Sequence, residues 1–290
     1  MPVNSHLLPL LLRSSSLTFI VIIFIVSFLL FLIGFQSMGL DSVSCLILDV
    51  YNLMFRNKGK RRTYIHNFRL ATILSFVAGI VNISGVLSLG VLTTNVTGHF
   101  AFFSEMFVSE NYRLALIYVS YISCFLTGAF FSSFIVEMTI EKRRFHSYSI
   151  PIITEAVIIL ITSFFSDLDI LFILPYVLLF AMGLQNALVT KVSQSVVRTT
   201  HLTGLFTDLG IELSQIIFYR TREERQKLLK SINLKVAIIL FFFLGGVIGG
   251  VLYKKIELKV LILASIFLLF AVSYDALLLK FYALRKRFRF

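Results

Sequence analysis

The 290-residue chain contains few charged residues, few cysteines and no catalytic motif. Charged residues make up only 14% of the chain and hydrophobic residues 58%, which does not suit a soluble domain of this size. Cys45 and Cys124 lack metal-ligand spacing, so we infer no disulfide, no metal site and no redox chemistry.

The chain also lacks the short motifs of common enzymes and cofactor sites. There is no Gly-x-Ser-x-Gly elbow, phosphate-binding P-loop, His-Glu-x-x-His or Cys-x-x-Cys sequence. We therefore expect no enzyme activity and no cofactor. The apolar runs show no sustained alternation of apolar and polar residues, which argues against a transmembrane barrel.

Long apolar runs are what the sequence has instead, with a mean hydropathy of +0.91. A helix needs about 20 apolar residues to cross a hydrocarbon core of roughly 30 Å. The candidate membrane spans are 17–36, 69–91, 113–137, 150–166, 170–190, 234–253 and 257–279.

The formal net charge of +12 lies in clusters between these spans. Membrane orientation explains such clusters better than a nucleic-acid ligand does, because positive loops stay in the cytoplasm. The clusters predicted to be cytoplasmic are 56–62, 142–144, 220–230 and 285–289, which places the C-terminus inside. Asp167 and Asp169 fit the outside, while Lys254, Lys255 and Lys259 would face outward against the rule.

Two stretches of the chain repeat each other. Residues 93–100, Thr-Thr-Asn-Val-Thr-Gly-His-Phe, return as residues 199–206, Thr-Thr-His-Leu-Thr-Gly-Leu-Phe, with five of eight positions identical. We call these segments the first and second Thr-Gly elements. A duplicated polar element in an apolar chain is typical of transporters built from two repeats around a shared site.

The repeat extends outward on both sides of the Thr-Gly elements. Phe76, Gly79 and Asn82 correspond to Phe180, Gly183 and Asn186 at an offset of 104, and Phe125, Leu126 and Gly128 correspond to Phe243, Leu244 and Gly246 at an offset of 118. Each repeat holds three spans, an odd number, so the second repeat should be inverted in the membrane relative to the first.

Each Thr-Gly element precedes a short helical stretch, 100–109 or 205–218, that is too short or too polar for a confident span. We expect re-entrant helices that start at Gly98 and Gly204, with glycine permitting the turn. Irregular backbone at membrane depth needs cover from protein or a water-filled cavity. The two elements should therefore face each other near the bilayer midplane.

Polar residues in and beside the spans are the candidate solute site. They combine the amides of the spans with the residues of both Thr-Gly elements: Asn82, Thr94, Thr97, Gly98, Gln185, Asn186, Thr200, Thr203 and Gly204. The amides have a structural alternative, because they can instead hydrogen-bond neighbouring helices.

Two acidic residues are candidates for carrying a proton, Glu155 within a span and Asp208 after the second Thr-Gly element. Glu212 shares a helix face with Asp208, and a solvated cytoplasmic face explains it equally well. His99 and His201 have no ligand partners at metal spacing.

Small residues four positions apart predict close helix packing. They are Gly245, Gly246, Gly249 and Gly250 in span 234–253, with Gly128 and Ser132 as counterparts in span 113–137.

The segments Phe76–Asn82, Thr93–Phe100, Met182–Ala187 and Thr199–Gly204 resemble the YoaK family of bacterial multi-pass membrane proteins. The resemblance covers about residues 66–282 and implies an inner-membrane protein of about six spans, without an established activity. Asn82 stands where the family pattern suggests aspartate, and His99 where asparagine is common. A proton- or cation-linked role for the first element is accordingly in question.

The sequence thus predicts an all-α polytopic protein with six core spans in two inverted three-span repeats. The core is 54–290, with repeats at about 66–166 and 170–282. Residues 1–53 form an extension with one apolar segment, which is either an extra N-terminal helix or a stretch outside the native core. Small-solute transport across the bacterial cytoplasmic membrane by alternating access is the expected function, and a non-transporting scaffold or regulator is the alternative. The expected partners are the lipid bilayer and an unidentified solute, with no nucleic acid, and homo-oligomerisation is left open.

Overall fold

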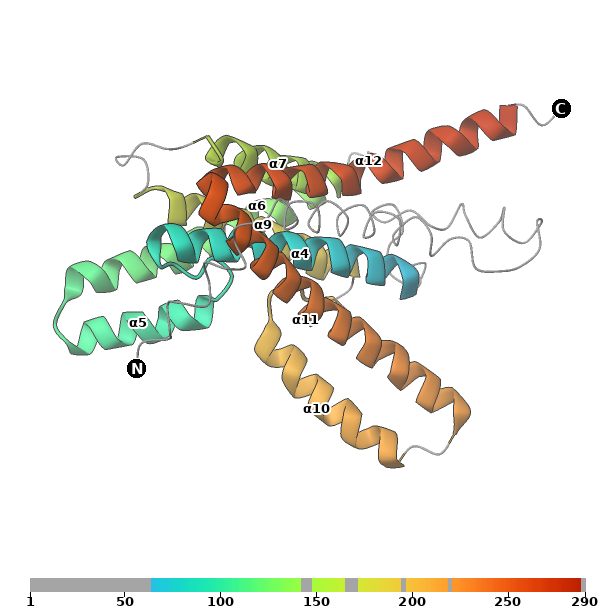
Figure 1. Ribbon diagram of the computed structural model, residues 1–290, viewed down its shortest axis with the longest axis horizontal. Helices are drawn as coiled ribbons and strands as arrows, with labels where there is room; N and C mark the ends of the chain where they lie inside the picture. The colour runs from blue at the N-terminus through green and yellow to red at the C-terminus, as the bar shows by residue number, and fades with distance from the viewer. Residues whose placement is uncertain (1–63, 142–147, 165–171, 194–196, 219–220, 288–290) are drawn as a thin grey trace. The chain divides into compact units, whose positions relative to one another are not determined.

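The computed structural model describes residues 64–141, 148–164, 172–193, 197–218 and 221–287, and regular structure in these ranges is entirely helical (Figure 1). The helices are α4 (Tyr64–Leu89), α5 (Val96–Val108), α6 (Tyr112–Glu141), α7 (Ser149–Thr162), α9 (Leu174–Ser193), α10 (Leu202–Phe218), α11 (Arg222–Ile256) and α12 (Val260–Arg287), with a short 3-10 helix, η2 (Glu257–Lys259), before α12. The predicted extension, 1–53, and the acidic loop with Asp167 lie outside the described residues.

Local sequence explains where these helices begin and end. Pro151 and Pro175 lie in the first turns of α7 and α9, where a missing N–H costs no helical hydrogen bond. α4 ends at Leu89 because Gly90 adopts a φ of 67°, which glycine tolerates and which closes the helix.

α11 begins well before the span that hydropathy predicts. The Thr221 side chain accepts a hydrogen bond from the Glu224 N–H, and two acidic residues occupy the first turn, where the helix dipole favours negative charge. The basic segment 222–233, expected as a loop, is therefore helical.

Four apolar stretches of the described residues are long enough to cross a membrane: Asn67–Leu89, Tyr112–Thr139, Leu174–Ser193 and Arg222–Ser273. The last contains α11 and the first half of α12, since only the three residues of η2 separate these helices. α7 is a shorter apolar helix. The protein is thus an all-helical chain with candidate membrane helices, and six separate spans stay a prediction.

Two close helix crossings organise the fold, and both depend on glycine. Where α4 crosses α11, a Cβ at Gly79 would lie 2.1 Å from the Phe242 carbonyl oxygen. Where α6 crosses α9, a Cβ at Gly183 would lie 2.1 Å from the Phe125 carbonyl oxygen. Both distances are far below van der Waals contact, so only glycine allows the backbones to approach this closely.

The crossings repeat each other, which fixes the register of the repeat. A Cβ at Gly245 would lie 2.1 Å from the Phe76 oxygen, and one at Gly128 would lie 2.1 Å from the Phe180 oxygen. Since Phe76 corresponds to Phe180 at an offset of 104, Gly128 must correspond to Gly245, at an offset of 117. The offset of 118 expected from matching letters is wrong by one residue.

The remaining contacts follow the same scheme in both halves. α12 packs on α4 and on α7, while α7 packs on α9, and α4 contacts α9 between the two crossings. α5 folds back on α6, and α10 folds back on α11, so that each half contains a helical hairpin in its middle (Figure 1). α4 is the central helix, with 78% of its apolar stretch buried, whereas 17% of that of α6 is buried.

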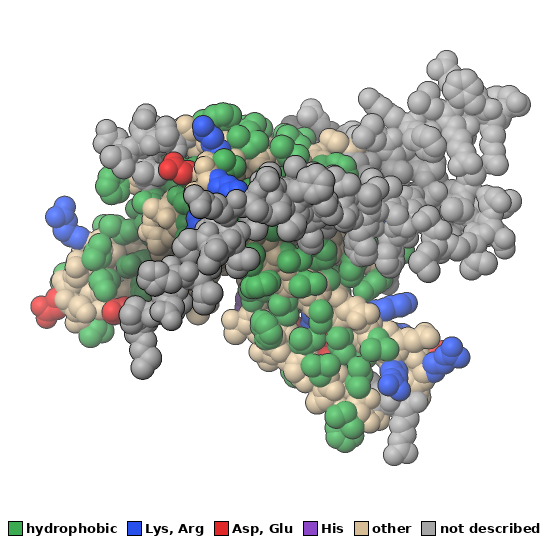
Figure 2. Space-filling view, viewed as in Figure 1, with side chains coloured by type: hydrophobic (Ala, Val, Ile, Leu, Met, Phe, Trp, Pro, Cys, Tyr) green, Lys and Arg blue, Asp and Glu red, His purple; other side chains and the backbone are tan. Residues whose placement is uncertain are grey.

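Exposed side chains along the α10–α11 hairpin are mainly hydrophobic, and charged ones gather near its tip (Figure 2). Phe206, Ile211 and Ile217 are exposed on α10, while the exposed Arg222 and Arg225 follow the turn into α11. A helix pair that is apolar along its length and basic at one end is typical of helices that extend to a membrane surface.

Candidate functional site

In each half, an asparagine side chain holds the Thr-Gly element against a long helix of the same repeat. The N–H and hydroxyl of Thr94 donate to Asn82 Oδ1 on α4, at 3.3 and 3.0 Å. The Thr200 hydroxyl donates to Asn186 Oδ1 on α9, at 2.7 Å. We call these two contacts the amide clamps. They hold an irregular segment against a long helix in both halves.

The glycines of the Thr-Gly elements lie in helices and not in the turns that the sequence predicts. Gly98 and Gly204 belong to the first turns of α5 and α10. The Gly98 N–H donates to the cap residue Asn95, at 3.0 Å from Oδ1. A Cβ at Gly204 would lie 2.2 Å from His201 Nδ1, in the matching cap position. Glycine here leaves room for the cap side chain, and neither Gly98 nor Gly204 adopts a left-handed φ.

The residue beside the second clamp contacts α4. Gln185, next to Asn186 in sequence, donates from Nε2 to the Leu74 carbonyl oxygen of α4, at 3.0 Å. Leu74 precedes Asn82 by eight residues, which is about 12 Å along a helix axis. Gln185 thus contacts α4 about two helical turns before the residue that forms the first clamp, and the meeting of Thr97 with Thr203 around one cavity stays a prediction.

Burial divides the residues of the Thr-Gly elements into two groups. Thr93 and Thr199, which sequence reasoning left out of the site, are completely buried. Thr97 and Thr203, which it included, are exposed. The repeated first threonine was visible in both sequence stretches, but its burial depends on how the element folds against α4 or α9.

The halves differ at the position before the clamp asparagine. Gln185 Nε2 lies 3.4 Å from the Thr199 hydroxyl oxygen, so Gln185 links α4, α9 and the second element. Its counterpart at an offset of 104 is Val81, which has no polar atom. The Thr93 hydroxyl accordingly has no partner among the described residues, although it is buried.

His99 anchors the first element from within α5. Its Nε2 lies 2.7 Å from the Leu92 carbonyl oxygen, and since a carbonyl only accepts, Nε2 carries the proton. The ring packs beside Tyr118 and Tyr121 of α6, at centroid distances of 6.1 and 5.4 Å. This arrangement gives His99 a structural role that connects the element, α5 and α6.

The two acidic candidates occupy opposite environments. Glu155 is completely buried in the face of α7 that packs on α9 and α12, and neither carboxyl oxygen has a partner among the described residues. Asp208 is exposed on α10. Only Glu155 therefore sits where adding or removing a proton would change the packing of the helix core.

Glu212 forms an ion pair with Lys235 and is not simply a solvated residue. Its Oε1 accepts from Lys235 Nζ at 2.6 Å and from the Ser231 hydroxyl at 2.7 Å, so α10 is joined to α11 by a mostly buried ion pair. Sequence reasoning missed this pair, although Lys235 stands out as a charge at the start of the predicted span 234–253.

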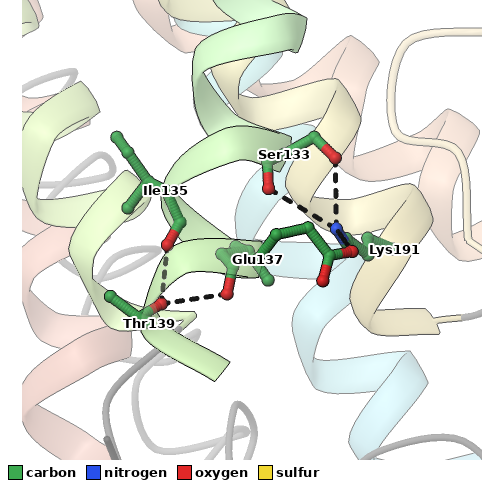
Figure 3. Close-up of polar contacts among 6 residues, drawn as sticks. Ser133, Ile135, Glu137, Thr139 and Lys191 are labelled. Carbon is green, nitrogen blue, oxygen red and sulfur yellow. Dashed lines mark hydrogen bonds and ion pairs between the residues drawn. The ribbon is translucent and has the colours of Figure 1, made fainter. Parts of the chain in front are cut away.

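A second ion pair joins α6 and α9. Lys191 Nζ donates to Glu137 at 2.5 Å and to the Ser133 hydroxyl at 3.1 Å (Figure 3). Glu137 is largely exposed, unlike Glu212. Among the residues that the structure describes, no cluster of histidine, cysteine or acidic side chains could hold a metal ion.

Comparison with known proteins gives a family without an activity. The family described as "Protein of unknown function (DUF1275)" matches residues 70–274, which include both Thr-Gly elements and both amide clamps. No curated protein and no solved structure matches the chain. This match neither confirms nor contradicts the resemblance to the YoaK family, because its description does not use that name. Because the match spans well over half of the sequence, the chain belongs to the DUF1275 family.

Proposed function

We propose that this protein moves a small solute across the bacterial cytoplasmic membrane by alternating access. Its core would be two inverted repeats, α4–α7 and α9–α12, each with three spans and one short helix that follows a Thr-Gly element. Residues 56–62 and the C-terminus would lie in the cytoplasm, and Glu155 would be the residue that carries a proton.

The observation that supports this proposal best is the pair of amide clamps. Asn82 and Asn186 occupy matching places in the two halves and hold matching threonines, Thr94 and Thr200. A protein that needed only stable helices would have no use for an irregular polar segment in each half, because helices satisfy their own backbone groups in lipid. Transporters place such segments at their binding sites.

A scaffold or regulatory protein is the second candidate function. The close glycine crossings and the lipid-exposed face of α6 would serve it as well as transport. The two functions differ in what the Thr-Gly elements do. In a scaffold, the Thr-Gly elements would only pack against the neighbouring helices. In a transporter, mutating these elements would change the amount of a solute in the cell.

Metabolite profiling of a deletion strain against an overexpressing strain would test transport. We expect at least one small polar solute to change in opposite directions in the two strains. If the protein is a scaffold, no solute should change in this way. Finding no such change in growth media that differ in carbon and nitrogen source would contradict the transport proposal.

Removing the clamp hydroxyls should impair transport more than folding. Thr94→Val and Thr200→Val keep the side-chain shape and remove one hydrogen bond each, worth about 1 kcal/mol in a membrane protein. We expect the solute change to fall about fivefold or more while the amount of inserted protein stays near normal. Thr127→Val on the exposed face of α6 is the matched control, and equal effects of all three would contradict a role in transport.

Labelling can test whether α11 crosses the membrane. Its 35 residues, Arg222–Ile256, span about 52 Å, more than the hydrocarbon core. In a variant without native cysteines, we expect Lys255→Cys to react with an impermeant thiol reagent from outside. Arg222→Cys should react only after permeabilisation. If both cysteine variants reacted from the same side, α11 would not cross the membrane, and the inverted topology would be contradicted.

A further inference from the structure

Two side chains of α9 that contact the second Thr-Gly element leave one hydrogen-bond acceptor and one donor without a partner among the described residues. Gln185 is completely buried, and its Nε2 donates to Leu74 and Thr199 while its Oε1 has no partner among the described residues. Asn186 accepts from Thr200 through Oδ1, while its Nδ2 is buried and likewise unpartnered in the described chain.

These two atoms belong to consecutive residues that contact consecutive residues of one element, Thr199 and Thr200. Buried polar groups in folded proteins nearly always find a hydrogen-bond partner, so an acceptor and a donor left open on two consecutive residues that both contact the second element indicate a ligand or an ordered water.

The first Thr-Gly element does not offer the same combination. Val81 replaces Gln185 there, so the acceptor is absent, and the clamp oxygen of Asn82 is shared by the N–H and hydroxyl of Thr94. Two halves that share a fold but differ in these groups would contact different parts of a solute.

We propose that the second Thr-Gly element binds the polar head of the transported solute, and that this head is uncharged with a donor and an acceptor on neighbouring atoms, as in a carboxamide. The inference rests on the proposed transport function. A carboxamide N–H would donate to Gln185 Oε1, and its carbonyl oxygen would accept from Asn186 Nδ2.

A carboxylate of the same shape fits poorly. It has no proton to donate, so it would place a negative oxygen against Gln185 Oε1. The residues that form this site, Gln185, Asn186, Thr199 and Thr200, contain no positive charge to compensate it. Charge without compensation inside a membrane protein is strongly disfavoured.

Acetamide and acetate are near-isosteric probes that separate these cases. We expect millimolar acetamide, but not acetate, to raise the unfolding temperature of the purified full-length protein in a saturable manner. Gln185→Met should raise the half-saturating acetamide concentration tenfold or more. Asn186→Asp should raise this concentration by a similar factor, because it removes the Nδ2 donor. It keeps the oxygen that accepts from the Thr200 hydroxyl. Leu188→Met, a buried swap on the same helix, should leave it unchanged.

Equal protection by acetate, or an undiminished acetamide response in Gln185→Met and Asn186→Asp, would overturn the inference. No response of the wild type to acetamide would also overturn it and would leave an ordered water as the occupant. If deletion and overexpression still changed a solute in opposite directions in cells, the transport proposal would survive that failure. If acetamide bound but no solute changed in any strain, the site would survive and the transport proposal would fall.

Discussion

Replacing Gly245 by alanine is expected to destabilise the protein strongly, while the same change at the next residue is not. A Cβ at Gly245 would lie 2.1 Å from the Phe76 carbonyl oxygen and 2.9 Å from its carbon. Both atoms are backbone, so no side-chain rotation relieves the clash and α4 and α11 must separate. Forced overpacking of this kind costs about 1–3 kcal/mol.

Gly246→Ala is the matched control, because only the Gly79 oxygen lies near its Cβ position, at 3.9 Å. Alanine also removes the entropic cost of glycine in a helix, roughly 0.5–1 kcal/mol. We expect Gly245→Ala to lower the temperature at which half of the purified protein stays monodisperse by roughly 5–10 °C. Gly246→Ala should leave it unchanged or raise it. Equal losses would show that α4 and α11 do not cross at Gly245.

Removing Lys235 should detach α10 from α11. In Lys235→Met, the Glu212 carboxylate keeps only its bond from Ser231 in a mostly buried position, since the Glu212 side chain is 17% exposed. An unpaired charge within a membrane helix costs about 2.5–3.5 kcal/mol. We expect loss of folded protein and rapid proteolysis between α10 and α11.

The double variant Lys235→Met, Glu212→Leu should recover most of this loss, because it removes the second charge as well. Lys191→Met is the comparison at the other ion pair, whose partner Glu137 is 66% exposed. Exposed pairs contribute about 0–1 kcal/mol, so its effect should be small. Failure of the double variant to recover would mean that the α10–α11 contact depends on Lys235 for more than charge.

Much of the helical organisation follows from local sequence. Apolar runs locate α4, α6 and α9 to within about five residues of their observed ends. α11 was placed twelve residues too late, because hydropathy ignores the polar first turns of a helix. The Thr221-x-x-Glu224 sequence was the available signal, as a hydroxyl followed three residues later by glutamate favours a helix start.

The candidate site was predictable in composition but not in arrangement. The duplicated letters identify Thr94, Thr200, Asn82 and Asn186, and these residues do contact each other in pairs. They do not reveal that Gly98 serves the cap of α5. They also do not reveal that Gln185 reaches across to α4, since that bond joins residues 111 positions apart. A hydrogen bond between helices depends on which faces meet.

By itself, the sequence determined that this chain is an all-helical protein with membrane-spanning stretches and a duplicated polar element, because hydropathy and letter identity are local properties. The tertiary structure alone decided which glycines of α11 meet the backbone of α4. Gly245 and Gly249 lie against its backbone, whereas Gly246 has nearly open space. It also decided that α4 is buried while the equally apolar α6 is exposed. Lipid is as apolar as a protein interior, so composition cannot tell a lipid-facing helix surface from one that packs on another helix.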